Sequence, residues 1–381
     1  MKDKRILFYV PEGNVETNGV YASQVLGLAR FCATLGAKCL IFQHIPKGVV
    51  QEDGVPKDVE PGVMVITDTV KRPYIPFWSL TKAYRRISKR FSNIFKDFSP
   101  THIYCRQYIT CRAAHDLSTT LGAKLVFSVR GADVEERLLG NGLKDWIAVA
   151  YIRWALKRAI KICDHLNTVS LVFADRLRLK YKRGASVLPC CIPPLTHTHQ
   201  ERDVANGKMI VYSGGLSPWQ KIDDILALMK EMSKIDDTLQ FKFLTKDIDS
   251  LKNKCQKIGL PADRWIAKAC KPNEVIDELS KADCGIIMRD NTVVNQVASP
   301  IKIGEYLQAG LGIIASPCIG DVGRLLAKEC FAKMYTGEES IQSLVDFVNG
   351  LDNKACIAAQ RFVQKHYTYE GNRVAVMEMF R

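Results

Sequence analysis

The chain has 381 residues, of which 47% are hydrophobic and 25% are charged. This length and this ordinary globular composition allow two domains with cores of their own, and they exclude an extended disordered protein and a small disulfide-stapled scaffold. The net charge of +14 lies wholly in residues 1–190, which hold 30 Lys and Arg against 16 Asp and Glu.

The first residues predict no targeting segment. Their apolar run ends at Pro11, so it is shorter than the core of a secretory signal, and no apolar run elsewhere approaches the roughly 20 residues that span a bilayer. The 13 cysteines are scattered without a C-x-x-C pair, which favours reduced, mostly buried thiols over a zinc site or disulfide framework. We expect a cytoplasmic protein.

Strand-like and helix-like segments alternate along two stretches of the chain, as they do in parallel sheets that helices cover on both faces. The first stretch predicts a helix over 20–35, and residues 353–381 predict two helices at the end of the chain. The predicted strands are 5–10, 38–43, 63–67, 102–105, 124–129 and 185–189 in the first stretch, and 208–213, 239–244, 282–288 and 311–316 in the second.

A connection at 190–207, with two prolines and no periodicity, separates the two stretches. We therefore predict an α/β protein of two Rossmann-like domains, 1–193 and 194–381, with a terminal helix from about 368 that could return to the first domain. Parallel sheets bind ligands beyond the carboxyl ends of their strands. Two such domains facing one another would form a cleft, and the loops after the strands should hold the functional residues.

Three loops of the first domain carry candidates. Asn18 and Gly19 precede a helix whose N-terminus could approach an anion, although a plain loop glycine would look the same. Arg106 and Arg130 end strands, and Arg130 is followed by Asp133. These side chains could hold a phosphate or a sugar hydroxyl, or they could form an ion-pair network that fixes the loop.

The second domain begins with a strand followed by Gly214 and Gly215, with Lys221 close behind. Glycines would admit a diphosphate to the backbone, and a lysine would neutralise it. The alternative is an exposed lysine after a turn.

The strongest signal is the run from Arg289 to the helix that contains Lys302 and Glu305. Pro300 suits the first turn of that helix, which predicts Ser299 as its cap and an anion site at the free N–H groups. Glu305 could accept hydrogen bonds from a ribose diol. A surface ion pair between Lys302 and Glu305 is the alternative.

The run S-P-x-K-x-x-E-Y-L at 299–307, with YSGG at 212–215, SVRG at 128–131, VLPCC at 187–191 and the Asn18-Gly19 loop, resembles the family 4 glycosyltransferases of the GT-B fold. Within that family, the sequence is most similar to bacterial enzymes that assemble surface polysaccharides. The resemblance implies transfer of a sugar from a nucleoside-diphosphate sugar to a glycan or lipid-linked acceptor, with retained anomeric configuration and without a metal or other cofactor.

The resemblance also assigns residues. Glu305 matches the second glutamate of the family's E-x7-E motif, whereas Val297 replaces the first, and the family's phosphate-binding Arg and Lys fall on Gly215 and Gln220. Either Lys221, Arg289 and Lys302 hold the phosphates instead, which we expect, or donor binding is impaired. The predicted catalytic residues are Arg130, Lys302 and Arg289. The predicted donor-binding residues are Gly19, Gly214, Gly215, Lys221, Ser299, Pro300, Glu305 and Tyr306, and those predicted on the acceptor side are Asn18, Arg106 and Asp133.

Two other patterns suggest metals only weakly. Asp247-x-Asp249 has the spacing of a carboxylate pair, but it suits the positive start of a helix, and His197 and His199 lack a third ligand nearby. We expect no metal site.

Basic side chains concentrate at 79–97 and 146–161, beside aromatic residues. This combination favours contact with the anionic inner face of the cell membrane, although a solvated basic helix is the alternative. The predicted membrane-contact residues are Trp78, Lys82, Arg85, Arg86, Lys89 and Arg90.

Three alternatives to a glycosyltransferase stay open: a sugar-nucleotide epimerase on the same fold, a non-catalytic protein that binds nucleotide sugars, and a nucleic-acid-binding protein. The last would explain the charge, but the chain lacks a recognisable nucleic-acid motif, so we expect no nucleic-acid partner.

Overall fold

The structure, a computed structural model, describes residues 1–11, 13–15, 19–44, 55–68, 80–138, 142–193, 207–271 and 274–381. The chain divides into two compact units. Unit 1 comprises Met1–Pro193 with Asn372–Arg381, and unit 2 comprises Pro194–Gly371.

Unit 1 is built on a sheet whose described strands follow the order β3-β4-β2-β1-β5-β6-β7-β8. Neighbouring strands run parallel, except that β3 is antiparallel to β4. Every residue from Ile6 to Val10 in β1 is fully buried, as expected for a central strand with both faces covered. The strands are β1 (Arg5–Val10), β2 (Lys38–His44), β3 (Lys57–Glu60), β4 (Val63–Asp68), β5 (His102–Cys105), β6 (Lys124–Ser128), β7 (His165–Thr168) and β8 (Ser186–Val187).

The helix predicted over 20–35 is present, but it contains a π-helical turn. It consists of α1 (Gly19–Tyr21), the π-helix η1 (Ala22–Leu26) and α2 (Gly27–Thr34), and Gly36 follows in the left-handed region with φ +88°. Helix α5 packs on β1, β5 and β6, and α3 and α7 pack on α5. The other helices of this unit are α3 (Leu80–Arg90), α4 (Ser92–Phe98), α5 (Tyr108–Leu121), α6 (Asp133–Arg137), α7 (Leu143–Ile162), α8 (Leu171–Tyr181) and α17 (Arg373–Met379).

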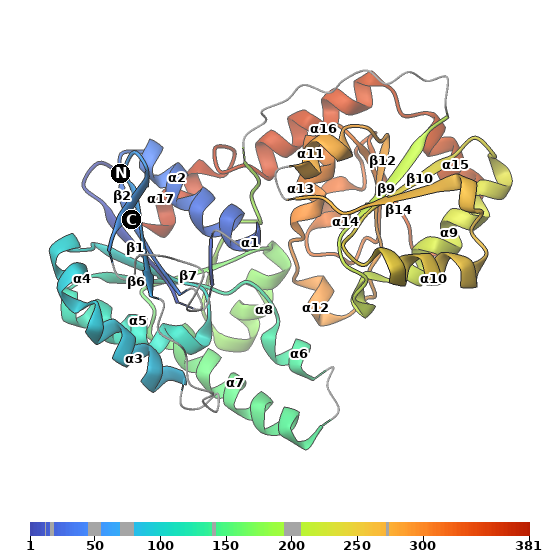
Figure 1. Ribbon diagram of the computed structural model, residues 1–381. Coiled ribbons are helices and arrows are strands. Elements are labelled where there is room, and N and C mark those ends of the chain that lie inside the picture. The colour runs from blue at the N-terminus through green and yellow to red at the C-terminus, as the bar shows by residue number, and fades with distance from the viewer. Residues whose placement is uncertain are drawn as a thin grey trace. The chain divides into compact units, whose positions relative to one another are not determined.

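The last helix, α17, belongs to unit 1 although unit 2 precedes it in the chain. Figure 1 shows it in red among the blue and green elements of unit 1. Phe380, which directly follows α17, is buried beside the rings of Phe8, Tyr104 and His102. The end of the chain therefore completes the core of unit 1.

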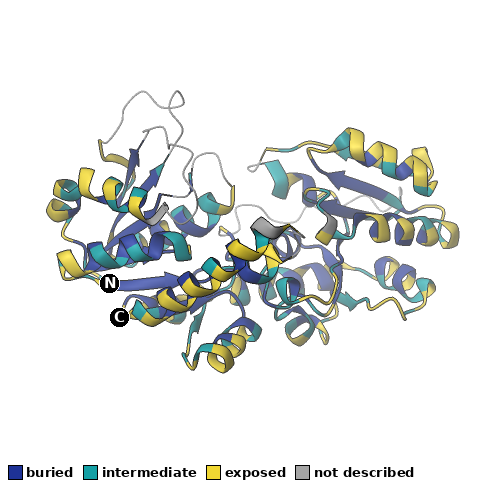
Figure 2. Ribbon diagram, turned by 90° about the horizontal axis from the view of Figure 1, so that it is seen from below, coloured by how far each residue is buried: buried dark blue, intermediate teal, exposed yellow. Residues whose placement is uncertain are grey.

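Unit 2 is built on a parallel sheet with strand order β11-β10-β9-β12-β13-β14, the 3-2-1-4-5-6 order of a Rossmann fold. Figure 2 shows the central strands dark blue and the helices yellow on their outer sides, so the core lies between sheet and helices. The strands are β9 (Met209–Ser213), β10 (Gln240–Leu244), β11 (Trp265–Lys268), β12 (Cys284–Ile287), β13 (Gly312–Ala315) and β14 (Ala332–Met334). The helices are η4 (Pro218–Gln220), α9 (Ile222–Ile235), α10 (Ile248–Ile258), η5 (Ala262–Arg264), α11 (Val275–Leu279), α12 (Val293–Gln296), α13 (Ile301–Gln308), α14 (Val322–Leu326), α15 (Ile341–Asn349) and α16 (Asn353–His366).

Four strands have no counterpart in the prediction: β3, β7, β11 and β14. Three of them lie at sheet edges, where short segments with polar residues suffice. The fourth, β7, is internal, yet its buried Asn167 and Thr168 hide the apolar signal. The side chain of Asn167 accepts a hydrogen bond from Ser128 Oγ (2.9 Å) and donates one to the Ser186 carbonyl (3.2 Å), so the fold satisfies it.

No helix in the described ranges has the length and apolar character needed to cross a bilayer. All 13 cysteines are free thiols, and nine of them are buried.

Candidate nucleotide-sugar site

The strand order of unit 2 reverses between β9 and β12, and open α/β sheets bind ligands at the carboxyl ends of strands at such a point. Gly214 directly follows β9, and Arg289 lies two residues after β12. Helix α13 brings Lys302 to the same place, because its ammonium lies against the Gly214 backbone. The fold therefore gathers three of the predicted site residues.

Gly214 is required here for two reasons. Its φ of +136° lies in the region that favours glycine, and a Cβ at this position would stand 2.9 Å from Lys302 Nζ. A side chain at position 214 would thus displace the lysine as well as strain the backbone.

Lys302 is a buried lysine, with 8% of its surface exposed. Its Nζ donates a hydrogen bond to Gln220 Oε1 (3.0 Å) and lies 4.7 Å from the centroid of the Tyr212 ring. Burial, together with repulsion from Arg289, lowers the pKa of Lys302 to about 7, although the Glu305 carboxylate acts in the opposite direction. An anion bound here would replace the lost hydration of the ammonium.

Arg289 is the second cation of the site. Its Nη1 donates to the Trp219 carbonyl (3.1 Å), and its backbone N–H donates to Ser316 Oγ (3.0 Å). Its Nε is buried without a hydrogen-bond partner, and burial lowers the pKa of the guanidinium. A buried donor without a partner is costly, so Arg289 retains capacity to bind an incoming acceptor such as a phosphate oxygen.

Tyr306 ties α13 to the two strands of the switch point. Its hydroxyl accepts a hydrogen bond from the Ser213 N–H (2.8 Å) at the end of β9 and donates one to the Ile286 carbonyl (3.4 Å) in β12. Its role is thus to position the helix. At the preceding residue, Glu305, burial raises the pKa of the carboxyl, while the charge of Lys302 opposes this shift. Lys302 is buried and its Nζ bonds Gln220, and among the described residues it forms no ion pair with the half-buried Glu305, so the alternative of a surface ion pair between them is not what the structure shows.

The prediction that Ser299 caps this helix is wrong. Helix α13 begins at Ile301, Pro300 occupies the cap position with ψ 128°, and no side chain caps it. The first intrahelical hydrogen bond runs from Ile303 N–H to the Pro300 carbonyl (3.2 Å). The N–H groups of Ile301 and Lys302 therefore precede that bond and form the start of the helix at the site.

Lys221 lies beside the site but is held by carboxylates. It pairs with Asp224 (2.7 Å) and Asp290 (3.0 Å), and these hydrogen bonds raise its pKa. Its backbone adopts a left-handed conformation with φ 50°. Gly215 is exposed next to Asp247, whereas Val297 is buried in the core.

Unit 1 has its own reversal of strand order, between β1 and β5. Gly19 begins α1 after β1, and Arg106 follows β5. The Arg106 guanidinium lies 4.9 Å from the centroid of the Tyr21 ring, and its Nη1 is buried without a hydrogen-bond partner. Asn18 lies outside the described residues.

Arg130 is held by neighbours within unit 1. Its Nη2 donates to Gln24 Oε1 (2.7 Å) and to Cys190 Sγ (3.2 Å), which links the strand end to η1 and to the segment after β8. Asp133 begins α6, where burial and the nearby Glu136 and Glu135 raise its pKa to about 7.

No group of three or more potential metal ligands occurs in the ranges that the structure covers. Asp247 Oδ2 instead accepts a hydrogen bond from the Leu216 N–H (3.3 Å). His197 and His199 fall in the undescribed 194–206 segment.

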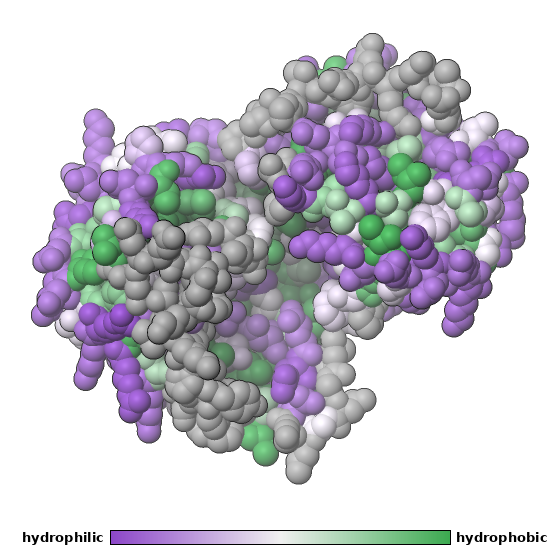
Figure 3. Space-filling model, in the orientation of Figure 1, coloured by the Kyte–Doolittle hydropathy of each residue, from purple (hydrophilic) through white to green (hydrophobic). Residues whose placement is uncertain are grey.

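The predicted membrane-contact residues on α3 divide into two groups. Arg85 pairs with Asp116, and Arg90 pairs with the buried Asp68, so these two guanidinium groups have partners within the protein. Lys82, Arg86 and Lys89 are exposed. On the face that Figure 3 shows, hydrophobic residues form small separate patches among hydrophilic ones. Trp78 lies outside the described residues.

The sequence did not reveal two supporting side chains, Tyr212 and Gln220, although both lie in the segment 211–224 that it singled out. Only the packing of α13 against β9 shows that Tyr212 lies beneath the Lys302 ammonium and that Gln220 accepts its hydrogen bond.

No protein-family model matches the sequence, and no match was found among curated proteins. Solved structures are similar over the whole length. Sucrose-phosphate synthase from Thermosynechococcus elongatus has a TM-score of 0.76 at 13% identity, with 99% of this chain and 97% of that chain covered. The apo form of the lipopolysaccharide outer core galactosyltransferase WaaB has a TM-score of 0.65 at 13% identity, with 98% of this chain and 99% of that chain covered. HepE from Anabaena, in complex with UDP and glucose, has a TM-score of 0.67 at 12% identity, with 98% of each chain covered.

These structures are glycosyltransferases of the GT-B fold. At such low identity the likeness establishes the fold, which is the predicted α/β architecture of two Rossmann-like domains. Membership of family 4 stays a prediction.

Proposed function

We propose that the protein is a retaining glycosyltransferase that moves a sugar from a nucleoside-diphosphate sugar to a glycan or lipid-linked acceptor in the synthesis of a surface polysaccharide. The observation that carries this proposal is the convergence of Arg289, Lys302 and the Gly214 backbone at the switch point of unit 2. Two cations beside a helix start and a glycine turn are the elements that bind a diphosphate.

The chemistry follows from these groups. When the bond between the anomeric carbon and the diphosphate oxygen breaks, negative charge grows on the leaving phosphate. Arg289 and protonated Lys302 stabilise that charge in the transition state, because they are already oriented in a site with little water. A phosphate oxygen of the leaving group accepts the proton of the acceptor hydroxyl, so the reaction needs no protein nucleophile. Glu305 binds the donor ribose.

We propose that these two cations, rather than a divalent metal, neutralise the diphosphate. Activity should then persist when EDTA is present throughout the assay. Loss of activity in EDTA that returns on adding Mg²⁺ or Mn²⁺ would overturn this part of the proposal.

The acceptor side belongs to unit 1. Arg106 and Asp133 are the described candidates there, and Arg130 is the catalytic candidate of the same unit. The exposed Lys82, Arg86 and Lys89 support contact with an anionic membrane that carries the acceptor. The galactosyltransferase WaaB, which has a similar fold, acts on a lipopolysaccharide core by its name, and this supports a cell-surface glycan as the acceptor.

The first experiment is a thermal-shift screen with nucleoside diphosphates and their sugars. A bound donor should raise the melting temperature, because it stabilises only the folded state. Lys302→Ala should abolish that shift or lower turnover by roughly 10²–10³, the effect of removing one donor to transition-state charge. Lys234→Ala, an exposed lysine on α9, is the matched control and should leave both unchanged.

Turnover assays beside this binding screen separate the alternatives. An epimerase would convert the donor without an acceptor, and a non-catalytic protein would bind donors without converting them across an acceptor panel. A nucleic-acid-binding protein would show steeply salt-dependent affinity for DNA or RNA and no shift with nucleotides.

A further inference from the structure

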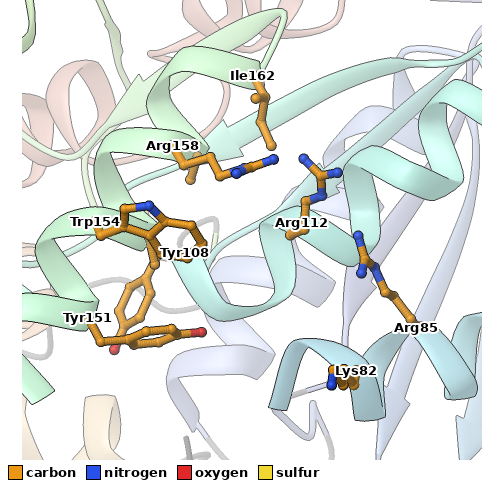
Figure 4. A pocket seen from close by; sticks show the side chains of 10 residues that line it. Lys82, Arg85, Tyr108, Arg112, Tyr151, Trp154, Arg158 and Ile162 are labelled. Atoms are coloured by element: carbon orange, nitrogen blue, oxygen red, sulfur yellow. The ribbon is translucent and has the colours of Figure 1, made fainter. Parts of the chain in front are cut away.

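A second site lies in unit 1, among the helices that cover its sheet. A pocket of about 390 Å³ opens between α3, α5 and α7. Its walls carry four cationic and three aromatic side chains: Lys82, Arg85, Arg112 and Arg158, and Tyr108, Tyr151 and Trp154. Figure 4 shows the guanidinium groups of Arg112 and Arg158 turned toward one another, with the three rings on one side.

Helical spacing explains how the lining side chains converge. Tyr108 and Arg112 are four residues apart on α5, and Trp154 and Arg158 are four apart on α7, so each pair lies on one helix face. The Arg158 guanidinium lies 5.6 Å from the Trp154 ring centroid, and the rings of Tyr151 and Trp154 are 6.0 Å apart. The pocket thus has a built aromatic wall next to its cations.

The charges in this pocket are not balanced. Asp116 pairs with both Arg85 (2.5 Å) and Arg112 (3.2 Å), and the side chains that line the pocket include no carboxylate. Within the ranges that the structure describes, Lys82 and Arg158 form no ion pair. Cations that converge with so little compensation repel one another, and a bound anion removes that repulsion.

A neighbouring pocket favours one orientation of such an anion. Tyr108 is a wall of both pockets, and the second one is also lined by Asp133, Glu136 and Arg137, of which Arg137 pairs with Asp145 (2.8 Å). Since Arg137 has a carboxylate partner, Asp133 and Glu136 make that side less favourable for an anion than the side of Arg112 and Arg158. The anionic end of a ligand therefore belongs between the arginines, and an uncharged part belongs against the rings.

We propose that this pocket binds a phosphorylated ligand. Arg112 and Arg158 hold the phosphate, assisted by Lys82, because arginine matches phosphate geometry with paired N–H donors. Tyr108, Tyr151 and Trp154 contact the sugar or apolar portion through their ring faces. The phosphate comes either from an anionic phospholipid headgroup or from a soluble sugar phosphate. The proposal does not depend on the donor site of unit 2.

The test uses the full chain and two probes. One probe is phosphatidylcholine vesicles with or without phosphatidic acid, measured by co-sedimentation, and the other is glucose 1-phosphate, measured by calorimetry, with glucose as its uncharged counterpart. Binding to the phosphatidic acid vesicles alone identifies the lipid source, and binding to glucose 1-phosphate alone identifies the soluble source. Binding to both supports recognition of the shared phosphate.

Arg112→Gln/Arg158→Gln should weaken whichever binding is seen by about tenfold or more, through the loss of two charge-assisted contacts. The control Arg153→Gln/Lys157→Gln removes the same charge from exposed positions of α7 outside the pocket, and it should change affinity by less than about twofold. Arg158→Gln alone, at an exposed position, repeats the test if the double variant melts at a lower temperature. Equal losses in the pocket and control variants, or no binding of either probe, would overturn the proposal.

Discussion

Lys302 combines burial with a neighbouring cation, and this makes its proton sensitive to what binds beside it. Its pKa is lowered to about 7, first by burial and then by Arg289. A diphosphate would supply the missing counter-charge and raise the pKa, so binding above pH 7 must take up a proton.

We therefore expect the affinity for a nucleoside diphosphate to fall as pH rises above about 7, by up to about tenfold per pH unit. Calorimetry across this range, in buffers of different ionisation enthalpy, measures both the affinity and the proton uptake. Lys302→Met should bind more weakly and lose the slope. An unchanged slope in that variant would show that another group takes up the proton.

The same lysine should oppose the stability of the empty protein. Its folded pKa lies below the ordinary lysine value, so the unfolded state binds more protons between about pH 7 and 10, and stability rises with pH in that window. Lys302→Met keeps the side-chain volume and removes this penalty. We expect it to melt several degrees higher than the wild type at pH 7 and to lose that advantage toward pH 10, in thermal unfolding without ligand.

Asp133 should change the stability of the protein with pH in the opposite direction. Burial, with Glu136 and Glu135, raises its folded pKa to about 7, well above the ordinary aspartate value. The native state binds more protons than the unfolded state between about pH 4 and 7, so this group's contribution to stability is lost as pH rises through 7. Asp133→Asn should flatten the decline and melt higher than the wild type at pH 8. Asp175→Asn, an exposed position on α8, should follow the wild-type profile.

At the scale of elements, the π-helical turn η1 contains Gln24, whose buried side chain accepts a hydrogen bond from Arg130. Gln24, in the middle of that turn, is 3% exposed. Its Oε1 accepts from Arg130, and its Nε2 donates to the Cys191 carbonyl (2.7 Å). A π turn widens the helix locally and occurs often at functional sites. One amide thus connects η1 to the segments after β6 and β8.

Gln24→Leu removes both hydrogen bonds and leaves a guanidinium with one acceptor fewer. We expect a loss of about 2–4 kcal/mol in the free energy of unfolding, since one of the bonds involves a charged donor. Denaturant unfolding measures this. Thr34→Ala, which removes an exposed hydroxyl of α2, should cost less than about 0.5 kcal/mol, and a similarly small cost for Gln24→Leu would refute the supporting role.

At the scale of the whole molecule, the chain leaves unit 1 at Pro193 and re-enters it at Asn372. The final helix buries Val376 and Met379, and Phe380 closes the core beside β1 and β5. Unit 1 therefore cannot be complete until the last residues of the chain have been made.

Phe380→Ala should lower the free energy of unfolding by about 3–5 kcal/mol through loss of a buried ring. Val374→Ala, on the exposed side of α17, is the control and should have little effect. The measurement is denaturant unfolding, with Lys302-dependent nucleotide binding as a readout of unit 2. A variant that retains wild-type stability would show that the tail is not part of the core.

The sequence by itself indicated the alternation of strands and helices, a boundary near Pro193, the loops that carry Gly214 and Arg289, and the helix that carries Lys302. Hydrophobic periodicity and turn residues are local signals, and central strands buried on both faces show them most clearly. Edge strands and the polar β7 escaped prediction, because their pairing with neighbours, rather than their composition, makes them strands.

Only the tertiary structure decided which charges have partners within the protein. In the sequence, nothing indicates that Lys302 and Arg158 differ from the other basic residues in their charge partners. In the structure, carboxylates distant in the chain or on the next helical turn bind Lys221, Arg85 and Arg90. The tertiary structure also decided that Pro300 and not Ser299 occupies the cap, and that three helices enclose a basic aromatic pocket. Electrostatic energies depend on burial and on distances of a few ångströms, and these quantities exist only once the chain has packed.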